Sequence, residues 1–413
     1  MGLIFESGLD YLQIMAFPFQ DLVIDAWNGG DSLSGLARFF KKLSISSYLP
    51  GAPYGVFLAM LYGLIFIIML IILDIVYVSY SFSKKKFRFT FPLVILAQIV
   101  PLFVTVFFIP ISESLLNVVE CERTLDGVWQ MTAYPDVECW TGWHLFHACF
   151  TLLFAVIFMV ISTVVALALF EPRMTSNKLT SRQNSNGEVV FIFNKIVLQF
   201  VFIFSPFEGS AFYVVTMFVL AFWQFWCYAV KQPYYSKTAT KFFKIVSTYY
   251  FWTALMLFVG QVLGSYGFNG ALVIWMSGLP FFAVIIYFES TSDIGKLFVN
   301  NLKFKSGEQL EQHISYVLQL VGSQGSDKNS YMLLIGYIEK HKEICNEADC
   351  PLKGERRKKK GEDSMDYSCQ QMLKQIERMF RSGIKKFPEC TKLRISFAFF
   401  QLEHLRNKER AYE

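Results

Sequence analysis

Seven apolar stretches follow one another through the first part of the chain, and they constrain the fold more than any other feature. A stretch of roughly 20 apolar residues can cross a bilayer as a helix. Lipid offers no hydrogen-bond partners, so the backbone of each stretch must pair within itself. The stretches lie at residues 54–82, 91–119, 144–170, 189–204, 211–230, 246–266 and 271–288. We therefore predict an all-α fold built on a polytopic transmembrane helical bundle of about seven spans.

The composition agrees with a chain that faces lipid. Of the 413 residues, 54% are hydrophobic and 17% are charged. Soluble domains contain about 45–50% apolar and about 25% charged residues. We expect an N-terminal interfacial or re-entrant segment at 1–53, a transmembrane helical domain at 54–289, and a small cytosolic, helical repeat-like region at 290–413. A remnant of a preceding span is the alternative for the N-terminal segment, and the chain would then be a fragment.

Lysine and arginine in the short loops predict the orientation, because such residues concentrate on the cytosolic side. The loops after the first, third and fifth stretches hold eleven of them, and the alternate loops hold Arg123 alone. The eleven are Lys84, Lys85, Lys86, Arg88, Arg173, Lys178, Arg182, Lys231, Lys237, Lys241 and Lys244. We expect the C-terminus to be cytosolic and the loop at 111–143 to be extracellular or lumenal.

The outer loop carries a cysteine near each end, Cys121 and Cys139. Thiols oxidise on the outer side of a membrane, so we predict a disulfide between them. The loop is also acidic, which is consistent either with a stapled linker or with a vestibule that attracts cations. His144 and His147 follow one turn apart at the outer mouth of the third span, as interfacial residues or as metal ligands.

Charged and amide side chains inside lipid usually face the interior of a bundle. Asp74 and Lys195 lie at matching depths in the first and fourth spans, so we predict an ion pair between them; separate snorkelling toward the cytosolic interface is the alternative. The mid-helix amides either bond between helices or line a pathway. These amides are Gln98, Asn194, Gln199, Gln224 and Gln261.

A cluster of soft ligands occurs in the tail, where His341, Cys345 and Cys350 follow one another in HKEICNEADC. Zinc prefers such ligands, and Cys369 or Cys390 could complete a site. The usual second pair of closely spaced cysteines is missing, so ordinary thiols remain the alternative. We predict no other cofactor.

The tail contains the stretch HKEICNEADCPLK, followed by two predicted helices that Pro388 separates. The second part, IERMFRSGIKKFPECTKLRISFAFFQLEHLRNKERAYE, resembles a tetratricopeptide-like repeat. Together with YLQIMAFPF and CWTGWH, these segments resemble the tiny macrocysts family of large protist membrane proteins. The resemblance implies architecture only. Stacks of such repeats need at least three copies, so either the chain is truncated or the tail docks on the membrane domain.

No enzyme motif is present: the sequence lacks a P-loop, H-E-x-x-H and G-x-S-x-G. We therefore expect a non-enzymatic membrane protein. One hypothesis is a receptor-like or scaffolding protein that presents its helical tail to cytosolic protein partners. The other is an ion channel or transporter subunit with a path through the bundle. The expected partners are the lipid bilayer and cytosolic proteins, and no nucleic acid. The sequence leaves open whether the protein forms an oligomer.

Overall fold

The computed structural model describes most of the chain. The described residues are 2–20, 23, 27, 53–124, 127–168, 181–204, 210–230, 233–264, 270–278, 304, 306–322, 328–345, 350–353 and 364–404. They form two compact units that do not follow the order of the chain. Unit 1 comprises Met1–Phe170, Ser185–Gln232 and Phe242–Ala283, and unit 2 comprises Glu171–Asn184, Pro233–Lys241 and Val284–Glu413. The two loops of unit 2 are therefore grouped with the tail and not with the apolar helices that they connect.

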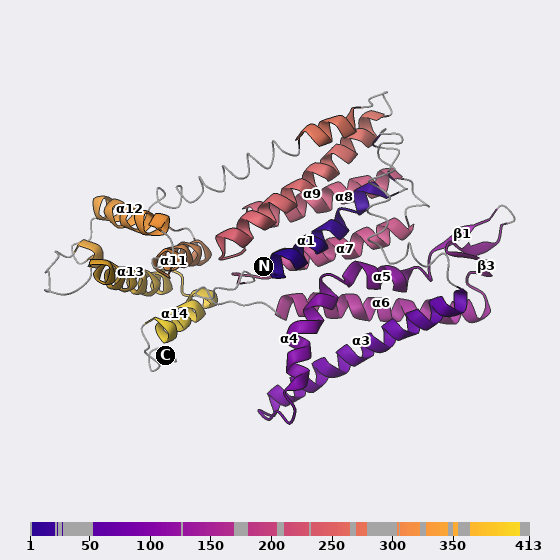
Figure 1. Ribbon diagram of the computed structural model, residues 1–413, viewed down its shortest axis with the longest axis horizontal. Helices are drawn as coiled ribbons and strands as arrows, with labels where there is room; N and C mark the ends of the chain where they lie inside the picture. Colours follow the sequence, from indigo (N-terminus) through magenta and orange to yellow (C-terminus); the bar gives the residue numbers. More distant parts are fainter. Residues whose placement is uncertain are drawn as a thin grey trace. The chain divides into compact units, whose positions relative to one another are not determined.

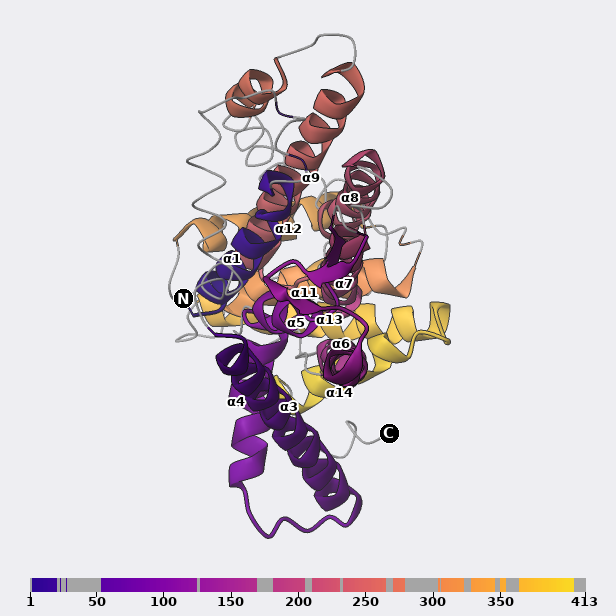
Figure 2. The same cartoon turned by 90° about the vertical axis from the view of Figure 1, so that its right-hand side faces the viewer.

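Unit 1 is a bundle of apolar helices, as the long apolar stretches predict (Figure 1). Its helices are α1 (Gly2–Ile14), α3 (Tyr54–Ser83), α4 (Phe91–Val104), α5 (Phe108–Leu116), α6 (Gly142–Ala168), α7 (Asn186–Phe204), α8 (Ser210–Phe225) and α9 (Lys237–Gly264), with a π-helical turn, η5 (Trp226–Val230), after α8 and a short 3-10 turn, η1 (Phe17–Phe19), after α1. The first turn of α9 belongs to unit 2. From the connection at 84–90, α3 and α4 run side by side (Figure 2).

The second apolar stretch is broken into α4 and α5, which are bent by 65° at the break. The break falls at residues 105–107, and Pro110 lies three residues after it, in the first turn of α5. A proline inside a helix removes one backbone bond, and its ring clashes with the carbonyl four residues earlier. For Pro110 that carbonyl belongs to Val106, so the proline explains where the helix stops.

Five described helices are long and apolar enough to cross a membrane, or up to six if the bent pair counts as one span. These properties fit a multi-pass membrane protein. Seven spans are not confirmed. The last predicted stretch, 271–288, is helical as far as residue 278 and then lies outside the described residues.

A small antiparallel sheet occupies the cysteine loop, where the sequence gives no reason to expect strands in an all-α chain. The strands β1 (Cys121–Arg123), β2 (Trp129–Met131) and β3 (Tyr134–Glu138) pair in that order. Cys121 lies opposite Met131, and Met131 lies opposite Tyr134. The sheet brings the two ends of the loop together beside the start of α6.

Unit 2 is a cluster of amphipathic helices around one hydrophobic core. It contains α11 (Gly307–Gly322), α12 (Lys328–Ile344), the 3-10 turn η6 (Pro351–Lys353), α13 (Ser364–Lys386) and α14 (Thr391–Glu403). The predicted helix pair around Pro388 is present as α13 and α14. Tyr235, from the loop before α9, is part of the same core.

α13 packs tightly on its neighbours at Gly383, where a Cβ would lie 2.1 Å from Leu310 Cδ2 and 3.1 Å from Leu393 Cδ2. Gly383→Ala is expected to destabilise unit 2 by about 1–3 kcal/mol, because it overpacks a core that has no spare room. A Cβ added at Gly336 in α12 would meet no atom within 4 Å, so Gly336→Ala is the matched control. The control is expected to be neutral or to stabilise by up to about 1 kcal/mol. Denaturant unfolding of both variants measures the difference, and equal stabilities would contradict the packing argument.

Candidate functional site

A buried ion pair joins α1 to α7 within unit 1. Lys195 Nζ donates to Asp10 Oδ1, and the two side chains are 0% and 6% exposed. The ammonium group also lies 3.4 Å from the carbonyl oxygen of Thr105, at the break between α4 and α5. The pair therefore connects three parts of the bundle, and the break between α4 and α5 supplies one acceptor of the ammonium group.

Aromatic rings surround the ammonium group of Lys195. Its Nζ lies 4.4 Å from the ring centroid of Phe191 and 5.6 Å from that of Phe108. Aromatic faces attract cations, most strongly where water is excluded. Nearby, the Thr105 hydroxyl donates to Glu6 of α1 over 2.8 Å. The ammonium group therefore has a carboxylate, a carbonyl and two aromatic rings as neighbours.

A second chain of polar contacts runs through the same region. Asn194 Nδ2 donates to Gln224 Oε1 over 2.7 Å, and Gln224 Nε2 donates to the hydroxyl of Tyr11 over 3.1 Å. Tyr11 follows Asp10 in α1, and Asn194 precedes Lys195 in α7. The two sets of contacts therefore share helices α1 and α7, and α8 joins them through Gln224.

The predicted pair between Asp74 and Lys195 is wrong. Asp74 lies on α3, which packs on α4, α5 and α6, whereas α7 packs on α6, α8 and η5. Matching depth in the membrane did not place the two helices next to each other. Asp74 is half-buried, and its Oδ2 has no hydrogen-bond partner among the described residues.

The predicted mid-helix amides separate into two groups. Asn194 and Gln224 belong to the cluster with α1, and Gln199 donates to the carbonyl of Ile109 over 3.2 Å. Gln261 instead bonds to Ser210 of α8, and Gln98 is exposed on α4. Four of the five amides therefore form interhelical hydrogen bonds, whereas Gln98 is exposed on α4.

Asp10 and Tyr11 are functional candidates that the sequence reading missed. Asp10 directly precedes the apolar stretch YLQIMAFPF. The available signal was an acidic residue in an apolar helix, since such a residue seeks a cation. The structure places this helix inside the bundle, with Asp10, Tyr11 and Ile14 all buried.

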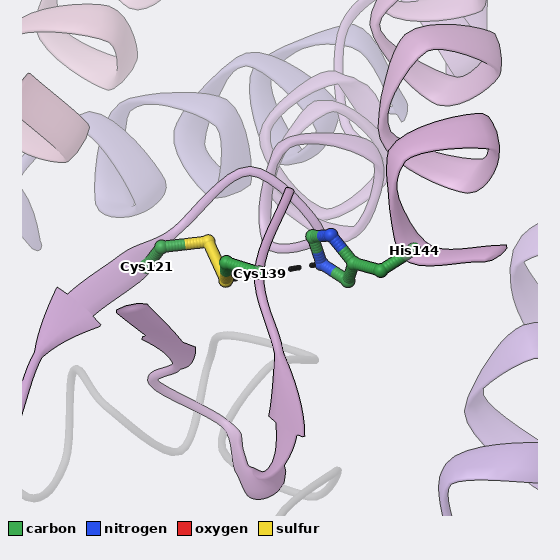
Figure 3. Close-up of side chains that lie close together, drawn as sticks. All are labelled: Cys121, Cys139 and His144. Atoms are coloured by element: carbon green, nitrogen blue, oxygen red, sulfur yellow. Dashed lines mark hydrogen bonds between the residues drawn. A yellow bond between two sulfur atoms is a disulfide. The ribbon is translucent and has the colours of Figure 1, made fainter. Parts of the chain in front are cut away.

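The outer loop carries the predicted disulfide between Cys121 and Cys139. Figure 3 shows the His144 ring pointing toward this bridge from the first turn of α6, with His144 Nε2 3.9 Å from Cys139 Sγ. His144 Nδ1 accepts from the backbone of Trp140 over 3.2 Å. The bridge and the imidazole together fix the loop against the start of α6.

Removing the bridge is expected to destabilise the loop measurably. Cys121→Ser with Cys139→Ser should reduce stability by about 3 kcal/mol, because the disulfide closes a loop of this size in the unfolded chain. Melting of the purified protein with and without reductant measures this. The double variant should lose the response to reductant, and a persistent response would contradict the assignment of the stabilisation to this bridge.

A buried carboxylate holds three segments of unit 2 together. Glu311 of α11 is 1% exposed. Its Oε1 accepts from the hydroxyl groups of Tyr235 and Ser396, each over 2.7 Å, and its Oε2 accepts from Gln183 Nε2 over 2.9 Å. We call Glu311 and these three partners the Glu311 joint. The joint links the loop at 181–184, the loop at 233–236 and the tail.

Backbone contacts reinforce the joint. The two loops pair with each other, since Gln183 N donates to Pro233 O over 2.7 Å and Tyr235 N donates to Ser181 O over 3.1 Å. Gln319 Nε2 of α11 donates to the carbonyl of Tyr235 over 2.7 Å. Burial and the neighbouring carboxylate of Glu311 raise the pKa of Tyr235, so its hydroxyl remains a donor.

The predicted ligand cluster of the tail is assembled. The side-chain ligand atoms of His341, Cys345 and Cys350 all lie within 4.8 Å of one another, and all three residues are buried. His341 is in the last turn of α12, and Cys350 directly precedes η6. Among the described residues, Cys369 and Cys390 are not part of this group.

Two curated proteins of Dictyostelium discoideum are similar to the chain. Tiny macrocysts protein C is 24% identical over 254 residues, which cover 61% of this chain and 18% of the relative. Tiny macrocysts protein B is 25% identical over 218 residues, which cover 52% of this chain and 15% of the relative. The chain is a relative of the tiny macrocysts proteins.

The tiny macrocysts proteins are far longer than the region compared, since the matched region covers less than a fifth of either relative. No family model matches the chain, and no solved structure matches it. The resemblance to the tiny macrocysts proteins found in the sequence is confirmed.

Proposed function

We propose that this is a non-enzymatic, multi-pass membrane protein with a receptor-like or scaffolding role, which presents unit 2 to cytosolic protein partners. In this proposal the loop at 111–143 is extracellular or lumenal, and the C-terminus is cytosolic. The distribution of basic residues among the loops supports the orientation. The tail is a tetratricopeptide-like helical region that binds proteins and not nucleic acid.

The Glu311 joint is the observation that carries the proposal. Residues 181–184 lie between α6 and α7, and residues 233–236 lie between η5 and α9. Because both loops contribute side chains to the joint, a shift of the helices that they connect would move Gln183 or Tyr235. A receptor needs such a physical connection between its membrane helices and the domain that its partners read.

Hydrogen exchange of the full chain in detergent micelles tests this connection. Gln224→Leu removes the polar link between α8 and α1, which lies in unit 1. We expect faster exchange in the peptides of α11, because the altered bundle loosens the loops that hold Glu311. Phe66→Leu is the matched control, since Phe66 is exposed on α3. Unchanged exchange in α11 despite a measurable loss of bundle stability would refute a receptor-like role.

A channel or transporter subunit is the second candidate, and the buried pair of Asp10 and Lys195 favours it. Intramembrane ionisable residues often mark ion or substrate pathways. Purified protein in liposomes should then support an ion flux that Asp10→Asn abolishes. Asp74→Asn is the matched control, because Asp74 lies outside the cluster. Folded protein that supports no flux would exclude this function.

A further inference from the structure

Three potential metal ligands meet in the core of unit 2, and the packing of the surrounding helices does not require these residue types there. His341, Cys345 and Cys350 are only 6%, 5% and 3% exposed. Cys345 and Cys350 are free thiols that belong to the hydrophobic core cluster. A small apolar side chain would fill either cysteine position equally well, so packing alone does not account for an imidazole and two thiols gathered in one place.

The spacing of the ligand atoms agrees with one tetrahedral ion. Zinc–sulfur bonds of about 2.3 Å and zinc–nitrogen bonds of about 2.0–2.1 Å place the ligand atoms of a tetrahedral site roughly 3.6–3.8 Å apart. His341 Nε2 lies 3.4 Å from Cys350 Sγ, and all three ligand atoms lie within 4.8 Å of one another. Small rotations of the side chains are enough to reach bonding distance.

The local backbone supports this arrangement. The backbone N–H of Cys345 donates to the carbonyl of His341 over 2.9 Å, which keeps Cys345 on the final turn of α12. The N–H of Lys353 donates to the carbonyl of Cys350 over 3.0 Å, within the turn of η6. Two regular backbone turns, one at the end of α12 and one at η6, therefore hold the ligands.

We propose that His341, Cys345 and Cys350 bind a zinc ion. Two thiolates and a neutral imidazole balance the charge of Zn²⁺, which suits a buried position. On binding, two zinc–sulfur bonds and one zinc–nitrogen bond form, and the two thiol protons leave to solvent. The ion fastens the end of α12 to η6, and its binding energy adds to the stability of unit 2.

A water molecule or Gln375 supplies the fourth ligand of the zinc ion. The side chain of Gln375 reaches the cluster from α13, with its Oε1 3.8 Å from Cys350 Sγ. Cys369 lies on the same helix outside the group and remains partly exposed. This difference makes Cys369 the natural control cysteine.

Elemental analysis of the full chain, purified in detergent without chelators and under reducing conditions, tests the proposal. We expect about one zinc ion per chain in the wild type and in Cys369→Ser. The double variant Cys345→Ser with Cys350→Ser should lose the zinc, and His341→Asn should retain it only weakly. The zinc site does not depend on the proposed cellular role, since its readout is metal content.

Cobalt substitution gives a second measurement that needs no variant. Wild-type protein reconstituted with Co²⁺ should show sulfur-to-cobalt charge-transfer absorption and tetrahedral d–d bands, which excess Zn²⁺ then abolishes. Absence of those bands in reduced, folded protein would overturn the proposal. The proposal also fails if the metal content is the same in the wild type and the double serine variant, or if Cys345 and Cys350 are joined by a disulfide in cell extracts whose thiols are alkylated at lysis without added reductant.

Discussion

Replacing Lys195 with Met is expected to destabilise unit 1 by about 3–5 kcal/mol. The substitution keeps much of the side-chain volume but leaves the carboxylate of Asp10 buried without its cation. Asp10 is 4% exposed, so water does not replace the lost partner. Denaturation of the purified protein in mixed micelles measures the loss.

A double-mutant cycle separates the pair from its surroundings. Asp10→Asn combined with Lys195→Met should be more stable than Lys195→Met alone, because the unpaired charge is gone. Asp74→Asn combined with Lys195→Met should instead be additive, since Asp74 lies on a helix that packs elsewhere. Strong coupling of Lys195 to Asp74, with none to Asp10, would show that the observed pairing is wrong.

Glu311→Ala is expected to destabilise unit 2 by about 4 kcal/mol. The change leaves the hydroxyl groups of Tyr235 and Ser396 buried without their acceptor, and each donor left in that state costs about 1–3 kcal/mol. Gln183 keeps its bond to the carbonyl of Glu308, at 3.1 Å, so it contributes less. Limited proteolysis within the loop at 233–236 and thermal melting of the full chain report the loss.

The neighbouring acid on the same helix is the matched control. Glu308 pairs with Lys392 over 3.2 Å, and both side chains are about half exposed, at 56% and 44%. Exposed ion pairs contribute about 0.2–1 kcal/mol, so Glu308→Ala should change little. Glu311→Gln keeps one oxygen acceptor and should fall between the two. If Glu308→Ala and Glu311→Ala were equally damaging, the joint would have no special role.

The helices were predictable because their signal is local. A long apolar run must satisfy its own backbone in lipid, and this rule alone locates α3, α6, α8 and most of α9. The break between α4 and α5 also follows from a local cause, the ring of Pro110. Local rules did not reveal the three strands of the outer loop, because these strands are only three to five residues long and their pairing joins segments apart in the sequence.

The candidate sites show the same division. His341, Cys345 and Cys350 are close in sequence, so their closeness was enough to predict a cluster. The partner of Lys195 was not predictable in this way, because it depends on which helices are neighbours. Depth along a helix leaves many acceptable partners, and Asp10 lies 185 residues away in the chain.

Unit 2 is assembled from pieces of chain that are synthesised far apart, and this has a consequence for how the protein is made. Roughly 160 residues separate Tyr235 from Ser396 in the chain. At about 5–20 residues per second, the ribosome needs on the order of ten to thirty seconds to synthesise them. During that interval the two loops have no core to join. The tail must then recruit segments that were synthesised earlier, so unit 2 folds around two loops that are already present.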